Sequence, residues 1–129
     1  MVYRNSDLKY EGEFVNGKKN GKGIEYDYDI KYIGQFLKGK KNGKGKEIYY
    51  YRYDNKESYT IFEGEYLNNY RIKGKEYYKN GKLKFKGDYL FKDKWNGKIY
   101  DNAGNMLFEL NNGNGIIEDK YDKIKIFIC

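Results

Sequence analysis

A five-residue pattern recurs along the 129-residue chain: an aromatic residue, any residue, Gly, a polar residue and a second aromatic. The clear copies read YEGEF at 10–14, YIGQF at 32–36, FEGEY at 62–66 and FKGDY at 85–89. A degenerate copy begins at Phe108 and has Leu110 where Gly is expected. The copies thus begin near residues 10, 32, 62, 85 and 108, and spacing of this kind is typical of a serial repeat array.

The pattern has the two-residue period of a β-strand. It places Tyr10, Gly12 and Phe14 on one face and Glu11 and Glu13 on the other, as in a half-buried strand. We expect each Gly to leave room for a neighbouring ring to lie over the backbone. The predicted aromatic stripe comprises Tyr10, Phe14, Tyr32, Phe36, Phe62, Tyr66, Phe85 and Tyr89, joined by Ile24, Tyr26, Ile48, Tyr77 and Trp95.

A second glycine landmark follows each copy. It reads NGKG at 20–23 and 42–45, KGK at 73–75, NGK at 96–98 and NGNG at 112–115. Because Asn-Gly favours tight reversals, each repeat is predicted to be a strand, a lysine-rich loop, a second strand and a turn. The chain is therefore predicted to be all-β, an elongated, twisted antiparallel β-meander of about five hairpin repeats in one domain over residues 1–129.

Two stretches resemble a known repeat family. Residues 10–23 are similar to the MORN repeat (membrane occupation and recognition nexus), and residues 76–87 resemble a second MORN variant found in bacterial antitoxin-like proteins. The resemblance extends over about residues 10–118. It implies an elongated β-meander that serves as a scaffold, a dimerisation module or a membrane-proximal module.

Composition excludes several classes of enzyme. The chain has no His and one Cys, which rules out a Ser-His-Asp triad, a His-bearing zinc site and an internal disulfide framework. We expect a non-enzymatic protein with no cofactor and no metal. The start of the chain lacks an apolar signal region, and the longest apolar run has four residues, so we expect a cytoplasmic location, either free or peripheral at a membrane.

The lysine-rich loops are one candidate binding site, since the net charge is +7 and repeat spacing puts the first two loops on one edge of the sheet. Such a rim would attract an anionic membrane surface, although solubilising lysines on exposed turns would look the same. Nucleic acid is not an expected partner, because Arg occurs only at positions 4, 52 and 71. The candidate lysines are Lys18, Lys19, Lys22, Lys38, Lys40, Lys41 and Lys44.

An aromatic run is the second candidate site. Consecutive aromatics project from both faces of a strand, so one side is expected to meet a partner protein, unless the rings only cover neighbouring strands. The candidate residues are Tyr49, Tyr50, Tyr51, Arg52 and Tyr53.

Two further features have structural interpretations. The recurring carboxylates Glu11, Glu13, Glu63 and Glu65 are expected to pair with lysines on adjacent strands rather than to act in acid–base chemistry. The alternating C-terminal segment 121–129 is expected to cap the sheet as its last strand, or to pair with a second chain in a homodimer. The sequence thus favours a scaffold or adaptor for an unidentified protein partner, with anionic-membrane binding as the alternative.

Overall fold

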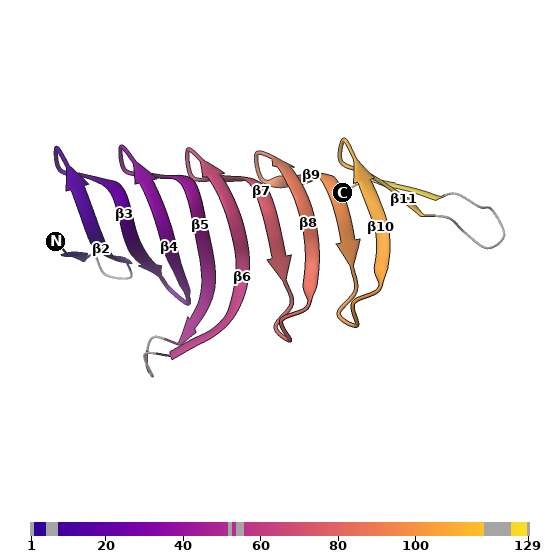
Figure 1. Cartoon of the computed structure of the whole chain (residues 1–129), viewed down its shortest axis with the longest axis horizontal. Helices are drawn as coiled ribbons and strands as arrows, with labels where there is room; N and C mark the ends of the chain where they lie inside the picture. The colour runs from indigo at the N-terminus through magenta and orange to yellow at the C-terminus, as the bar shows by residue number, and fades with distance from the viewer. Residues whose placement is uncertain (1, 5–7, 52, 54–55, 118–124, 129) are drawn as a thin grey trace.

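The computed structural model describes residues 2–4, 8–51, 53, 56–117 and 125–128. These residues form one antiparallel sheet of twelve strands, whose order in space follows their order in the chain. Figure 1 shows the strands side by side in a long row, joined by turns at alternating edges. The predicted all-β meander is therefore confirmed.

Five hairpin units make up most of the sheet. Unit one is β2–β3, unit two β4–β5, unit three β6–β7, unit four β8–β9 and unit five β10–β11, with β1 and β12 at the two ends. The strands are β1 (Val2–Arg4), β2 (Leu8–Val15), β3 (Lys18–Asp27), β4 (Ile30–Leu37), β5 (Lys40–Tyr51), β6 (Lys56–Leu67), β7 (Tyr70–Tyr77), β8 (Leu83–Leu90), β9 (Asp93–Tyr100), β10 (Met106–Asn111), β11 (Asn114–Ile117) and β12 (Lys125–Ile128).

A row of glycines, which we call the glycine ladder, crosses the sheet. Each member lies directly opposite the next, and the row comprises Gly12, Gly23, Gly34, Gly45, Gly64, Gly74, Gly87 and Gly97 of strands β2 to β9. A methyl group on Gly12 would lie 2.6 Å from both the Gly23 Cα and the Tyr10 hydroxyl oxygen. The ladder is therefore the place where rings lie directly on backbone, as the sequence predicts.

The aromatic rings of the repeat pattern form a continuous core on one side of the sheet, the aromatic face. Tyr10, Tyr32 and Phe62 are almost fully buried. Ring centroids 5.0 to 5.7 Å apart, at interplanar angles of 74° to 89°, join each ring to the next in the edge-to-face geometry that aromatic pairs favour. The order of this chain of rings is Phe14, Tyr10, Phe36, Tyr32, Tyr66, Phe62, Tyr89 and Phe85.

The five residues expected to join this stripe do not join it. Three of them lie on the other side of the sheet, which we call the charged face. There Ile24 lies opposite Glu11, and Ile48 is in one cross-strand row with Tyr26. Tyr77 borders a hollow on the charged face, and Trp95 lies at a bulge against the turn of unit five. The prediction was wrong because the inward positions of the second strands hold glycine and charged residues instead.

The lysine-rich segments are strands rather than loops. The reversal in unit one occurs at residues 16–17, and the following Asn20-Gly21 lies inside β3 as a bulge in which residues 20–22 face Glu13 alone. Gly21 supplies the positive φ of 90°, and the Glu13 carboxylate accepts a hydrogen bond from the Lys22 amide at 2.5 Å. Asn-Gly here forms a bulge within a strand and does not reverse the direction of the chain.

Turns at residues 16–17, 38–39, 68–69, 91–92 and 112–113 line one edge of the sheet, drawn uppermost in Figure 1. Neighbouring turns are joined through the bulges: the Gly39 amide donates to the Lys19 carbonyl at 2.8 Å, and the Gly113 amide to the Trp95 carbonyl at 2.8 Å. At the lower edge, β5 and β6 extend beyond the strands on either side (Figure 1). The repeat step of 30 residues therefore lengthens one hairpin.

Candidate interaction surfaces

Each of the first four units places a cation over its own first aromatic ring. Lys41 Nζ lies 4.9 Å from the Tyr32 ring centroid, and the Arg71 guanidinium carbon lies 4.5 Å from that of Phe62. Lys19 over Tyr10 and Lys94 over Phe85 repeat the arrangement at 5.7 Å. These contacts cover the aromatic face with long side chains and leave little of the ring surface free.

Arg71 is the centre of a charge network at unit three. Its guanidinium contacts Glu47 Oε2 at 2.6 Å through one terminal nitrogen and approaches Glu76 Oε1 at 3.7 Å through the other. Glu76 also accepts from the Tyr89 hydroxyl at 2.5 Å and pairs with Lys94 at 3.3 Å. Burial, together with this hydrogen bond, raises the pKa of Tyr89 well above its ordinary value. Since these groups satisfy one another, the network stabilises the fold and leaves no open acid–base pair.

Three tyrosines cluster on the extended hairpin. Tyr49 stacks on Tyr59, with centroids 5.7 Å apart and an interplanar angle of 12°, and contacts the edge of Tyr51 at 5.2 Å. Ile30 is the cross-strand partner of Tyr49 and is itself exposed. The negative charge of Asp29 raises the pKa of Tyr49 above its ordinary value. We call Tyr49, Tyr51 and Tyr59 the tyrosine cluster.

The predicted aromatic site is therefore divided. Tyr50 points to the charged face, where it is buried and its ring packs 5.1 Å from that of Tyr26. Tyr53 is 93% exposed, and Arg52 lies outside the described residues. Tyr59, which the sequence analysis did not name, completes the cluster from β6. The structure brings together two of the five predicted residues on one surface.

The candidate lysines also divide between the two faces. Lys19 and Lys41 lie on the aromatic face, over rings, and Lys19 is paired with Glu25. Lys22 and Lys44 border hollows on the charged face. The remaining three, Lys18, Lys38 and Lys40, are exposed at the first two upper turns. The two turns do share an edge, but their lysines do not form one cluster.

An aliphatic row that the sequence analysis missed runs along the same upper edge. Val15, Leu37, Leu67 and Leu90 each end the first strand of a unit, and their exposed fractions are 45% to 53%. In units one and two they lie opposite lysines, since Val15 pairs with Lys18 and Leu37 with Lys40. The signal was present as an aliphatic residue directly after each second aromatic of the pattern.

The recurring carboxylates act structurally. Glu65 pairs across strands with Lys73 at 3.1 Å, as expected, whereas Glu11 pairs with Lys9 on its own strand at 2.6 Å. Asp88 and Gln35 take the place of Glu13 in units four and two and accept from backbone amides at 2.9 and 3.0 Å. Within the described residues, no three Cys, Asp or Glu gather as metal ligands.

Two other points concern the ends of the chain and the membrane. β12 pairs with β11 at the end of the sheet, in the capping position that the sequence predicts, and Cys129 lies outside the described residues. Among the residues described, no helix is long and apolar enough to cross a membrane.

Comparison with known protein families agrees with the units seen in the structure. The family model described as MORN repeat matches residues 10–29 and 32–50, which correspond to units one and two. MORN repeats are generally modules that bind proteins or membranes. A comparison with curated proteins finds no match to this chain.

Proposed function

Because residues 10–29 and 32–50 match the MORN repeat, we propose that the chain is a cytoplasmic, non-enzymatic scaffold that binds a partner protein through the tyrosine cluster. The observation that supports this proposal is the packing of three tyrosine rings, of which Tyr51 is exposed and Tyr49 and Tyr59 are half-buried, on a hairpin that extends past its neighbours (Figure 1). The eight rings of the repeat pattern, by contrast, pack against one another on the aromatic face.

The chemistry of the tyrosine cluster suits a protein interface. Tyrosine buries a large apolar area and has only two side-chain torsions to fix, and it is among the residues that contribute most to binding energy. Mutual packing of Tyr49, Tyr51 and Tyr59 holds the rings in place before any partner arrives. Such pre-organisation lowers the entropic cost of association.

The test is affinity capture of the full chain from its native cell, with mass spectrometry of the proteins retained. A stoichiometric partner should be held by the wild type and lost by the double variant Tyr49→Ser/Tyr51→Ser. The matched control is Tyr70→Ser, which changes a tyrosine that is similarly exposed at the upper edge. Circular dichroism should be unchanged in all variants. If the double variant unfolds, or keeps the partner, the tyrosine cluster is a structural element only.

A second candidate function is binding to an anionic membrane surface. It is supported by the aliphatic row, because aliphatic side chains beside lysines at one edge are suited to the lipid headgroup region. Liposomes containing phosphatidylserine should retain the wild type at low salt and release it as salt rises. Leu37→Ser and Lys40→Gln should each weaken retention, whereas Tyr49→Ser/Tyr51→Ser should not. Absence of retention at low salt would exclude this function.

A further inference from the structure

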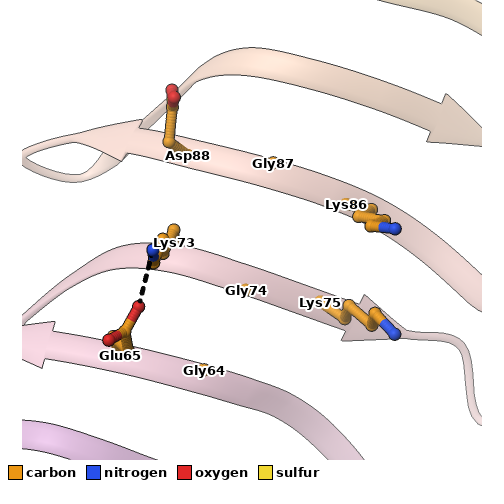
Figure 2. A pocket seen from close by; sticks show the side chains of 8 residues that line it. All are labelled: Gly64, Glu65, Lys73, Gly74, Lys75, Lys86, Gly87 and Asp88. Carbon is orange, nitrogen blue, oxygen red and sulfur yellow. Dashed lines mark ion pairs between the residues drawn. The ribbon is translucent and has the colours of Figure 1, made fainter.

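The charged face has a shallow trough along the glycine ladder. The ladder residues face the aromatic side of the sheet, so on the charged face the residues before and after each Gly stand as two walls above bare backbone. Over β6, β7 and β8 the trough has a volume of about 390 Å³, with Gly64, Gly74 and Gly87 along its floor (Figure 2). The floor is backbone, so a ligand could approach it closely.

One wall of this trough is a run of three lysines. Lys75, Lys86 and Lys98 are direct cross-strand partners on β7, β8 and β9, and all three are exposed. Figure 2 shows Lys75 and Lys86 side by side, both extending away from the Glu65–Lys73 pair. We call these three residues the lysine row.

Acidic residues flank the lysine row at its two ends but do not reach its middle. On the opposite wall, Glu65 is paired with Lys73, and the Asp88 carboxylate accepts a hydrogen bond from the Asn96 amide. Glu63 and Glu109 lie next to the row only at its two ends, opposite Lys75 and Lys98. No ion pair involves the three lysines within the described residues. Lys86, in the middle, therefore has lysine on both sides.

Like charges directly opposite one another destabilise a sheet. Elsewhere on this wall the order is favourable, since Lys46 is opposite Glu63. A run of like charges that reduces the stability of the sheet is the kind of feature that function maintains. We propose that the lysine row is a binding site for a soluble oligophosphate, an anion with two or more linked phosphates. This site is separate from the tyrosine cluster and does not depend on its function.

The side-chain chemistry suits an anion of high charge density. Lysine binds phosphate as a point charge, and three neighbouring lysines match an anion whose negative charges lie close together, as those of linked phosphates do. Strands are about 4.8 Å apart, so the three lysines follow a line of closely spaced anions. Binding would relieve the repulsion within the row and so stabilise the fold.

The experiment measures thermal unfolding of the full chain with and without sodium tripolyphosphate, at ionic strength matched with sodium chloride. Tripolyphosphate should raise the Tm of the wild type by about 3–5 °C. Lys86→Gln should have a higher Tm than the wild type without ligand, by about 1–2 °C, and should lose most of the ligand-induced rise. The matched control, Lys46→Gln, removes a lysine with an acidic partner, so it should keep the ligand-induced rise without raising the Tm.

Three results would overturn the proposal. The first is no rise of the wild-type Tm with tripolyphosphate. The second is an equal rise in Lys86→Gln and Lys46→Gln, which would make the effect one of net charge. The third is loss of binding to phosphatidylserine vesicles in Lys86→Gln with the tripolyphosphate response intact, which would assign the lysines to a membrane surface instead.

Discussion

Units one and two differ from units three and four at a single residue in the second strand. In unit one, the ladder glycine Gly23 lies four positions after Lys19, the cation that covers the ring. In unit three, Gly74 lies only three positions after Arg71. The first pair of units therefore has a wide bulge at residues 20–22 and 42–44, and the second pair has only one extra residue, Ile72 or Trp95. The family model matches the wide-bulge units.

The first aromatic residue changes together with the bulge. Where the bulge is wide, it is tyrosine: the Tyr10 hydroxyl donates to the Glu13 carbonyl at 2.9 Å, and Tyr32 makes the same bond to Gln35. Where the bulge is narrow, it is phenylalanine, at Phe62 and Phe85. The comparison teaches that tyrosine, with its hydroxyl bonded to a carbonyl, accompanies the wide bulge, and phenylalanine the narrow one.

The largest predicted effect concerns what both pairs of units share, the glycine ladder. Gly12→Ala and Gly87→Ala should each destabilise the fold by on the order of 4 kcal/mol, because the new methyl group would meet backbone atoms of the next strand. Urea unfolding followed by circular dichroism measures the change in the free energy of unfolding. The control is Gly17→Ala, in a turn with open space around it, where the positive φ should cost about 1–2 kcal/mol. A mild effect at Gly87 alone would mean that the narrow bulge relaxes the ladder.

A smaller effect is expected from the charge network around Arg71 of unit three. Arg71→Met should destabilise the fold by about 3 kcal/mol, because it leaves the largely buried carboxylates of Glu47 and Glu76 without their shared cation. Lys19→Met in unit one leaves only Glu25 unpaired and should have about half the effect. The free energies of unfolding of both variants are compared by chemical denaturation at neutral pH. Equal losses would show that the network adds nothing beyond the simple pair.

The smallest effect tests the link between ring and bulge directly. Phe62→Tyr adds a hydroxyl to a fully buried ring and should cost about 1–2 kcal/mol. Insertion of Gly after Ile72 recreates the wide-bulge spacing of unit one. The two changes together should be less destabilising than the sum of the two alone by about 1 kcal/mol. A double-mutant cycle of unfolding free energies measures this coupling, and strict additivity would contradict it.

The repeat pattern allowed the strands, their pairing and the main core to be predicted, because each glycine landmark marks a register position. The chain of rings from Phe14 to Phe85 follows directly from the fixed spacing between each glycine and the two aromatics on either side of it. The bulges could not be predicted, because Asn-Gly supplies a glycine of positive φ in both settings, Gly17 in a turn and Gly21 in a bulge. Only the acceptor at Glu13, supplied by the strand opposite, decides between the two. The expected face of Ile24 and Tyr26 was wrong because Gly23 and Glu25 take the inward positions of that strand.

The candidate sites depended more on tertiary detail. The long hairpin was visible as an insertion, but register shifts on either side of Ile48 decide which tyrosines face outward. Alternation alone does not identify Tyr59 as the partner of Tyr49. The lysine row also arises from pairing between three strands, and no segment of the chain shows it by itself.

The order of the strands has a mechanical consequence. Each strand is bonded only to the strands before and after it in the chain, so the sheet has no long-range crossing that would lock its ends together. Tension applied between the two ends would therefore peel strands away one at a time, each step breaking only a few hydrogen bonds. A molecule built in this way should yield at low force and lengthen gradually, as a compliant tether does.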